Sequence, residues 1–360
     1  MTDLTKQQDF PPLKNDRILK VIKGEEPDKL PIWVMRQAGR YMPKFREFRK
    51  LHSFFEICQT PELACEVTLM PIERFDFDAA IIFSDILVIP QALGLEVEMK
   101  ESVGPVIKNP VTIENLNDLN TEGAADRLNY VGEAITLTRK RLNGKVPLIG
   151  FAGAPWTLMG YMIEGGGSKT YSKSKKWLYA HETEAHRLLK ILTDVIIDYL
   201  ILQVKSGAQL LQIFESTNRN AEYLNEYLFD RFCQPYLQRI AIEVKNKIAE
   251  LKLDVPMILF AKGSHYSLEK QKSLGYDVIG IDWTISPKTV RQILGDQVVQ
   301  GNLDPCALYA SPEGIRAHVD EMIKGFGTGN LVVNLGHGIY PDMSEEAVEI
   351  FIDAVHSVKL

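Results

Sequence analysis

Short, almost continuously apolar stretches recur along the chain, separated by longer stretches in which apolar residues return every three or four positions. Strands of a parallel sheet covered on both faces are apolar throughout, whereas the helices that cover it carry one apolar stripe. The pattern therefore predicts strand–helix units that build a parallel sheet. The predicted strands are residues 31–35, 79–83, 146–151, 208–214, 256–261, 278–282, 298–302 and 331–335.

Helical periodicity fills the intervals between these strands. The predicted helices are residues 61–75, 113–142, 182–206, 219–250, 264–274, 287–294, 311–325 and 344–357. An excursion between residues 85 and 110 contains a predicted hairpin, formed by 95–99 and 105–107.

Eight strand–helix units in 360 residues predict the α/β class and a (β/α)8 (TIM) barrel. The barrel would form a single domain over residues 15–360, preceded by an N-terminal extension, 1–14. A doubly wound open sheet is the alternative, although no G-x-G-x-x-G motif follows the first predicted strand. The barrel predicts an active-site cleft at the C-terminal ends of the strands.

Composition and charge limit the class of partner. The net charge of −6 argues against nucleic acid as a ligand. No apolar run approaches the roughly 18 residues of a membrane span, and the N-terminal residues show no signal for secretion or import. We therefore expect a cytoplasmic protein with no membrane contact. The cysteines lack CxxC spacing and are interpreted as buried small residues of a reducing compartment, at Cys58, Cys65, Cys233 and Cys306.

A cluster of arginines follows the first predicted strand. It consists of Arg36, Arg40, Arg46 and Arg49. A guanidinium is always charged, and its planar set of N–H donors matches a carboxylate or a phosphate. The small residues Ala38 and Gly39 leave room for a ligand to approach the backbone between Arg36 and Arg40. A solvated basic turn is the alternative. The apolar strand before the cluster favours an anion-binding site.

Polar or small residues also follow the other predicted strands, where a barrel places its functional side chains. They are Ser84 and Asp85, residues 153–157 with Tyr161, Glu215 and Ser216, residues 262–265, Asp282, Asp304 and His337. Because any loop provides polar residues, each of these positions alone is weak evidence.

Four of these residues are candidates for the site, and each has a structural interpretation beside the functional one. Asp85 lies between apolar stretches and is either a cap or arginine partner, or a fixed charge that stabilises a cation. His337 is flanked by two glycines, and Tyr161 lies in a segment apolar enough for core packing. No G-x-S-x-G elbow surrounds Ser216, which argues against a serine nucleophile.

Several common catalytic motifs are absent from the sequence. There is no Walker A loop, no H-E-x-x-H and no cluster of metal ligands. Together with the arginines, this predicts an enzyme that acts on a small anionic molecule without a metal or another cofactor. The residues by themselves do not identify the reaction.

Five segments resemble the uroporphyrinogen decarboxylase family. They are 31–43 (PIWVMRQAGRYMP), 83–87 (FSDIL), 150–158 (GFAGAPWTL), 214–216 (FES) and 334–338 (NLGHG). The segments occur in the expected order and span nearly the whole chain. The resemblance implies a single (β/α)8 barrel, usually a homodimer, with no metal or prosthetic group. The implied reaction converts the four acetate side chains of uroporphyrinogen III to methyl groups, giving coproporphyrinogen III in heme biosynthesis.

The resemblance also implies roles for residues of the matched segments. Arg36, Asp85 and Tyr161 are the implied catalytic residues, with Asp85 accepting hydrogen bonds from the pyrrole N–H groups. The implied substrate-binding residues are Arg36, Gln37, Ala38, Gly39, Arg40, Arg49, Asp85, Tyr161, Ser216 and His337.

An acid-assisted loss of CO₂ suits these roles. Protonation of a pyrrole carbon creates a cation that Asp85 would stabilise, and Arg36 is the first candidate for proton delivery. The high pKa of a guanidinium makes it a poor general acid, so this assignment stays open. Two alternatives also stay open: a zinc enzyme that transfers methyl groups from corrinoid proteins to thiols, and a non-catalytic tetrapyrrole carrier.

Overall fold

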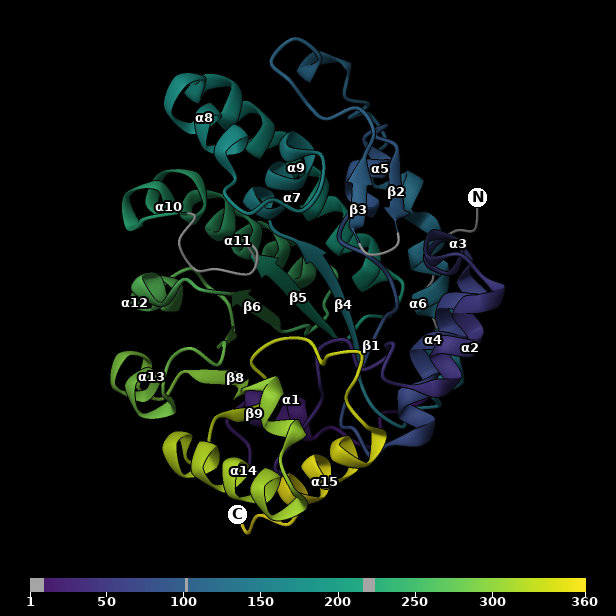
Figure 1. Ribbon diagram of the computed structural model, residues 1–360, viewed down its shortest axis with the longest axis vertical. Coiled ribbons are helices and arrows are strands. Elements are labelled where there is room, and N and C mark those ends of the chain that lie inside the picture. The colour runs from purple at the N-terminus through teal and green to yellow at the C-terminus, as the bar shows by residue number, and fades with distance from the viewer. Residues whose placement is uncertain (1–9, 101–102, 216–223) are drawn as a thin grey trace.

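The computed structural model describes residues 10–100, 103–215 and 224–360. Its centre is a curled parallel sheet surrounded by helices (Figure 1). The strands are β1 (Ala80–Ile81), β4 (Leu148–Gly153), β5 (Leu210–Glu215), β6 (Met257–Ala261), β7 (Val278–Gly280), β8 (Val298–Leu303) and β9 (Leu331–Leu335). They pair in chain order, and every pairing is parallel. A doubly wound sheet reverses its strand order, so this alternative is wrong.

One set of helices covers the outside of the sheet (Figure 1). They are α4 (Pro61–Arg74), α6 (Asn129–Leu142), α7 (Pro155–Glu164), α9 (Glu182–Lys205), α11 (Gln234–Glu250), α13 (Pro287–Leu294), α14 (Pro312–Phe326) and α15 (Glu345–His356). Local sequence signals start several of them. In α14, for example, the Ser311 hydroxyl accepts a hydrogen bond from the Gly314 N–H, and Pro312 occupies the first helical position.

The remaining described α-helices occupy the connections. They are α1 (Arg17–Ile22), α2 (Pro43–Leu51), α3 (Phe54–Gln59), α5 (Val88–Ala92), α8 (Ser172–Ala180), α10 (Glu226–Phe232) and α12 (Leu268–Lys272). The sequence pattern predicted α12 within a longer helix but missed α1, α2, α3, α5, α7 and α8. The predicted hairpin is confirmed as β2 (Val97–Lys100) paired antiparallel with β3 (Gly104–Ile107).

The sheet separates two hydrophobic cores because successive side chains of each strand point to opposite faces. In β6, Ile258 and Phe260 belong to the inner core, whereas Leu259 belongs to the outer core beneath the helices. Ile18 and Val21 of α1 join the inner core. Both faces of the strands are therefore buried, which explains why the strands show no polar alternation.

The first predicted strand, 31–35, is a single parallel bridge rather than a strand. Ile32 bridges Val333 of β9, with a hydrogen bond of 2.8 Å from the Val333 N–H to the Pro31 carbonyl oxygen. On the other side, the Ile32 carbonyl oxygen accepts a hydrogen bond of 2.8 Å from the Asp78 N–H. The described residues thus form a curled sheet of seven named strands, and one bridge joins the segment 31–35 to its edge at β9.

Side chains explain why no longer ladder forms at this segment. The Val34 N–H donates to Oε1 of Gln37 at 3.5 Å, and the Met35 N–H donates to Oδ1 of Asn334 at 3.1 Å. Pro31 has no N–H to donate. The Trp33 N–H donates to the Val333 carbonyl oxygen at 3.3 Å, but the other backbone donors of this segment are absent or already bonded to side chains.

The helix predicted over 113–142 is wrong over its first half. Only α6 is an α-helix, and residues 116–118 and 126–128 are short 3-10 turns. The Asn115 side chain accepts from the Thr112 N–H at 2.8 Å, a local bond that competes with helix formation. Arg127 donates hydrogen bonds to three carbonyl oxygens of residues 92, 120 and 122, which holds the irregular segment in place.

The helix predicted over 219–250 is two helices, α10 and α11. Pro235 lies in the first turn of α11, where its missing N–H is tolerated, but it ends the continuity with α10. Residues 219–223 of this prediction lie outside the described residues.

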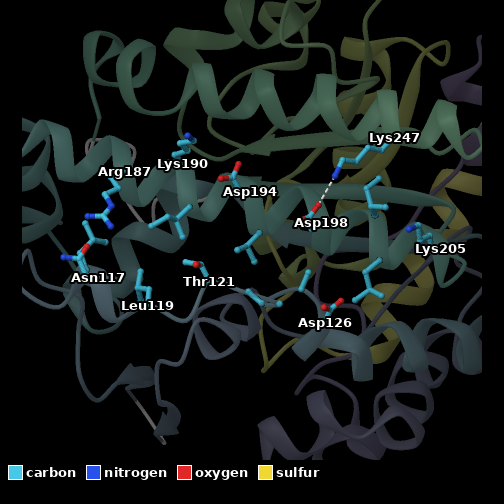
Figure 2. Close-up of a pocket in the computed structure, with 18 of the residues that line it drawn as sticks. Asn117, Leu119, Thr121, Asp126, Arg187, Lys190, Asp194, Asp198, Lys205 and Lys247 are labelled. Atoms are coloured by element: carbon cyan, nitrogen blue, oxygen red, sulfur yellow. Dashed lines mark hydrogen bonds and ion pairs between the residues drawn. The ribbon is translucent and has the colours of Figure 1, made fainter. Parts of the chain in front are cut away.

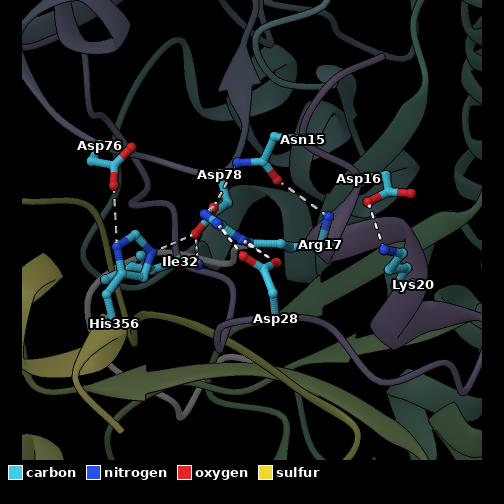
Figure 3. Close-up of polar contacts among 9 residues, drawn as sticks. All are labelled: Asn15, Asp16, Arg17, Lys20, Asp28, Ile32, Asp76, Asp78 and His356. Atoms are coloured by element: carbon cyan, nitrogen blue, oxygen red, sulfur yellow. Dashed lines mark hydrogen bonds and ion pairs between the residues drawn. The ribbon is translucent and has the colours of Figure 1, made fainter.

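A buried carboxylate joins both ends of the chain to the start of β1 (Figure 3). Asp78 is fully buried and accepts hydrogen bonds from Asn15 Nδ2, Arg17 Nη1, the Ile32 N–H and His356 Nε2, at 2.8 to 2.9 Å. Burial raises the pKa of Asp78, but the hydrogen bonds from His356 and Asn15 outweigh it and hold the pKa below its ordinary value. This cluster connects segments that are distant in sequence.

Candidate active site

Arg36 ends the first extended segment in a left-handed backbone conformation, with φ of 64°. A residue other than glycine adopts this conformation at a cost, so the surrounding structure must hold it. A Cβ at Gly39 would lie 2.7 Å from the Arg36 carbonyl oxygen. The absence of a side chain at Gly39 therefore permits the tight turn that directs Arg36.

The loop after β9 lies directly against the Arg36 side chain. A Cβ added at Gly338 would lie 2.7 Å from Arg36 Cγ and 2.8 Å from its Nε. His337, the neighbour of Gly338, is thereby brought beside Arg36. Its ring lies 5.9 Å from that of Trp283 and 6.1 Å from that of Tyr340, measured between centroids.

The Arg36 guanidinium lies among several other candidate residues. Desolvation lowers its pKa, Tyr161 and Asp85 act in the opposite direction, and Arg40 lowers it further. Tyr340 also acts on it, which places this tyrosine in the same neighbourhood. The Arg36 side chain still has solvent access, so a ligand can reach it. The structure thus brings these four candidates together.

Asp85 follows β1 and is partly buried. Its Oδ1 accepts a hydrogen bond of 2.8 Å from the Leu87 N–H within the turn before α5, so Asp85 is not the helix N-cap that one interpretation of the sequence predicted, because that position is Leu87. Burial raises the pKa of Asp85, whereas the Leu87 N–H and the charge of Arg36 lower it. The residue is therefore both a turn cap and an electrostatic partner of Arg36.

Tyr161 is presented by α7, and a buried carboxyl group anchors this helix. The Thr157 hydroxyl donates a hydrogen bond of 2.7 Å to Oε1 of Glu215, at the end of β5. Burial raises the pKa of Glu215 to about 8, even though the hydrogen bonds from Thr157 lower it. Glu215 is 2% exposed, and its side chain is therefore largely protonated at neutral pH.

The structure does not place every predicted residue in this group. Gln37 is buried, and its Nε2 donates to the Ala79 carbonyl oxygen at 3.1 Å, so its side chain stabilises the fold. Arg49 donates to the His52 carbonyl oxygen, and its guanidinium lies 5.8 Å from the centroid of the Phe54 ring. No described contact joins Arg49 to Arg36. Ala38 and Gly39 are partly buried, and Ser216 lies outside the described residues.

Sequence reasoning missed two residues that surround the site, Tyr340 and Trp283, and named Glu215 only as a polar residue at the end of a strand. Tyr340 acts on Arg36, Trp283 contacts His337, and Glu215 anchors α7. For Tyr340 and Trp283 a signal was present, because each lies within three residues of a strand-end candidate. The role of Glu215 depends on burial by helices and had no comparable sequence signal.

A cavity of about 1120 Å³ lies away from these residues, between α9, α11 and the segment 116–126 (Figure 2). Eight of its twenty lining residues are charged, and one pair, Lys247 and Asp198, is joined at 2.9 Å. No predicted site residue lines this cavity. Its walls are two helices and an irregular segment rather than strand ends, so its size does not identify it as the active site.

The described residues contain neither a cluster of metal ligands nor a helix that could span a membrane. No group of three or more His, Cys, Asp or Glu side chains in these ranges is arranged to hold a metal ion. Nor does any helix within them combine the length and apolar character that crossing a bilayer requires.

Comparisons with known proteins identify the family of the chain. The family model described as "Uroporphyrinogen decarboxylase (URO-D)" matches residues 13–358. The uroporphyrinogen decarboxylases of Danio rerio and Homo sapiens are each 54% identical, over 97% of this chain and 95% of theirs. The Drosophila virilis protein of that name is 50% identical, over 97% of this chain and 96% of its own.

A solved structure of a methyltransferase from Methanosarcina mazei shares the fold, with a TM-score of 0.76 over 96% of this chain and 98% of the other. At 21% identity, this likeness concerns the fold alone. The family match and the identities are far more specific. This chain belongs to the uroporphyrinogen decarboxylase family.

Proposed function

We propose that this protein decarboxylates the four acetate side chains of uroporphyrinogen III to methyl groups, giving coproporphyrinogen III in heme biosynthesis. The observation that carries the proposal is the grouping of Arg36, Asp85 and Tyr161 at the ends of different elements, in a chain 54% identical to relatives of that name. No metal or other cofactor is part of the proposal.

The substrate carries eight carboxylates, which suits a cationic site on a protein of net charge −6. Arg36 and Arg40 are close enough for their charges to interact, and a carboxylate between them would relieve that repulsion. The further proposed contacts to substrate are the backbone of Gln37, Ala38 and Gly39 and the side chains of Arg49, Tyr161, Ser216 and His337.

The proposed mechanism uses the substrate as its own electron acceptor. A proton adds to the pyrrole carbon beside an acetate arm, and the resulting cation accepts the electron pair of the breaking C–CO₂ bond. The exocyclic methylene that remains takes up a proton to become a methyl group, and the ring releases the first proton. Each catalytic cycle therefore replaces one carboxylate with one hydrogen and releases CO₂.

Asp85 is the proposed stabiliser of the cation. A carboxylate that is poorly solvated interacts strongly with a positive charge, and the raised pKa of Asp85 reflects such poor solvation. Arg36 is the proposed holder of the departing carboxylate and the first candidate for proton delivery. The desolvation that lowers its pKa acts in the direction that a general acid requires. Tyr161 completes the proposed catalytic group.

We also infer the larger organisation from the family. Residues 15–360 would form one (β/α)8 barrel with residues 1–14 as an extension. The bridge between Ile32 and Val333 and the hydrogen bond from the Asp78 N–H to the Ile32 carbonyl oxygen support 31–35 as its eighth strand. A homodimer is the proposed assembly. Free thiols at all four cysteines support the proposed cytoplasmic location.

Anaerobic incubation with uroporphyrinogen III tests the reaction. After oxidation, the products are separated by their number of carboxylates, and stepwise appearance of species with seven to four carboxylates is expected. Tight binding without any loss of carboxylate would instead favour the tetrapyrrole carrier. Metal analysis of the active protein separates the proposal from the zinc-dependent methyl transfer that the sequence left open.

Asp85→Asn tests the proposed catalytic charge. The variant keeps the shape of the side chain but loses its charge, and we expect kcat to fall by about 10²–10³. Asp254→Asn is the control, because Asp254 is an exposed carboxylate paired with Lys23. Both variants should show the circular dichroism of the wild type. Near-normal turnover of the folded Asp85→Asn protein would remove Asp85 from the mechanism.

A further inference from the structure

Lys262 directly follows β6, at the C-terminal edge of the sheet. Its N–H donates a hydrogen bond of 3.1 Å to the Glu215 carbonyl oxygen at the end of β5. Phe260 belongs to the inner core and Ala261 to the outer core, so Lys262 comes next on the inner side of the sheet. Lys262 therefore lies at the C-terminal edge of the sheet, on the same inner face as the inner-core residues of the neighbouring strands.

An aromatic ring positions the ammonium group of Lys262. Its Nζ lies 5.2 Å from the centroid of the Trp283 ring, within the range of a cation–π interaction. The loop after β9 holds Trp283 in turn, because a Cβ at Gly336 would lie 2.9 Å from Trp283 Cβ. This contact therefore fixes the position of the ammonium group relative to the loop after β9.

The same ring joins Lys262 to the site already described. Trp283 meets the His337 ring edge to face, at a centroid distance of 5.9 Å and an angle of 80°. Gly338, the next residue, lies against the side chain of Arg36. Lys262, His337 and Arg36 thus follow one another along the edge of the sheet, each contributed by a different segment of the chain.

The neighbouring loop contains the carboxylate of Asp282. Asp282, which follows β7, accepts hydrogen bonds from the Gly263 N–H at 2.6 Å and from the Thr284 N–H and hydroxyl at 2.8 and 2.7 Å. His265 Nε2 lies 3.3 Å from Asp282 Oδ1. The contacts of Asp282 therefore stabilise the two loops around Lys262.

We propose that Lys262 is a further substrate-binding residue, which takes a carboxylate of the tetrapyrrole on the far side of His337 from Arg36 and Arg40. This inference rests on the proposed function. A macrocycle with carboxylates on its whole circumference needs cations on more than one side, and the arginine cluster supplies only one. Lys262 adds a second cationic position, contributed by β6 instead of the first segment.

Three variants test the proposal by steady-state kinetics with uroporphyrinogen III. Lys262→Met removes the charge but keeps an apolar stem against Trp283, and we expect KM to rise about tenfold or more with kcat changed by less than about threefold. Lys262→Arg keeps the charge and should recover most of the affinity. Lys288→Met is the matched control, since it removes one exposed lysine from α13 and should leave both parameters unchanged.

The outcomes separate this inference from the proposed function. If the wild type decarboxylates the substrate and Lys262→Met has the KM of Lys288→Met, Lys262 does not bind substrate although the function stands. If Lys262→Arg fails to recover the affinity lost in Lys262→Met, the role of Lys262 is packing against Trp283, and the inference is also wrong. Should Lys262→Met not fold, Lys262→Gln replaces it in the same comparison.

If the wild type shows no decarboxylation, the proposed function fails and binding alone tests Lys262. Equilibrium titration with uroporphyrin I, the oxidised macrocycle with eight carboxylates, then compares the wild type with the same variants. A dissociation constant raised about tenfold in Lys262→Met, but not in Lys288→Met, would support carboxylate binding by Lys262. Equal constants for the two variants would overturn it.

Discussion

Arg36 shows how several weak constraints define one functional side chain. Its backbone is left-handed, with φ of 64°, and its side chain runs between the Gly338 backbone and the charges of Asp85 and Arg40. Each constraint comes from a different part of the chain. The direction of the guanidinium is therefore decided by the assembled site and not by the residues beside Arg36 in sequence.

Gly338→Ala tests this dependence at the scale of one methyl group. The added Cβ would overlap Arg36 at Cγ and Nε, so the guanidinium must shift. A displacement of about 1 Å in a positioned group can cost up to roughly 10²-fold, and we expect kcat/KM to fall by about 10- to 100-fold.

Gly329→Ala is the matched control for this substitution. Nothing lies within 4 Å of a Cβ at Gly329, so activity should stay at the wild-type level. Circular dichroism and thermal unfolding of both variants would show whether either has lost its fold. Full activity in Gly338→Ala would mean that the position of Arg36 does not limit the reaction.

At the scale of single elements, the contact between β5 and α7 deserves a direct test because it combines burial with a titratable group. Glu215 has a pKa raised to about 8, whereas its ordinary value is 4.5. Between these values the unfolded chain ionises and the folded protein keeps its proton. The folded state then binds more protons, so the free energy of unfolding falls as pH rises from about 4.5 to 8.

Glu215→Gln should remove this pH dependence. Glutamine keeps an acceptor for the Thr157 hydroxyl, and we expect the variant to gain stability relative to the wild type as pH rises through this window. Urea unfolding at pH 5, 6.5 and 8 measures the difference. Thr157→Val serves as the control, because it removes the hydrogen bond but keeps the buried carboxyl and should retain the decline. A constant difference between Glu215→Gln and the wild type would contradict the raised pKa.

Hydrophobic periodicity identified elements well where packing against the sheet decides them. The predicted strand 331–335 coincides with β9, and the predicted helix 182–206 differs from α9 by one residue. It failed where side chains bond to the backbone locally. The side chains of Asn115 and Arg127 form hydrogen bonds with backbone groups of the segment predicted as the start of a long helix. The spacing of apolar residues cannot predict such bonds.

At the scale of the whole molecule, Asp78 connects the two ends of the described chain. Asn15 and Arg17 near its start and His356 near its end all donate to this one buried carboxylate (Figure 3). Removal of one partner from a buried ionic cluster costs about 3–5 kcal/mol, because the remaining groups keep their desolvation cost.

Asp78→Asn should therefore lower the free energy of unfolding at pH 7 by about 3–5 kcal/mol. The pKa of Asp78 is below its ordinary 3.8, so the contribution is complete above pH 3.8 and is lost as pH falls through the folded-state pKa. Urea unfolding at pH 7, 5 and 3.5 should show a constant deficit at the two higher values and a smaller one at the lowest.

Asp28→Asn is the control for the Asp78 cluster. Asp28 pairs with the same arginine, Arg17, but its side chain is 64% exposed, and such pairs contribute about 0–1 kcal/mol. An equal effect of the two substitutions would mean that burial adds nothing to the Asp78 contacts.

The sequence by itself determined the class of fold, the order of the strands and most of the candidate residues. Short apolar runs that alternate with amphipathic stretches favour parallel strands under helices, and the motif around Arg36 resembles the uroporphyrinogen decarboxylase family. Tertiary structure decided which candidates meet. Asp85 and Tyr161 interact electrostatically with Arg36, whereas Arg49 donates a hydrogen bond to the His52 carbonyl oxygen. The direction of each side chain depends on contacts between segments far apart in the chain. The roles of Glu215 and Lys262 emerged only from burial and from a shared ring, which no local pattern contains.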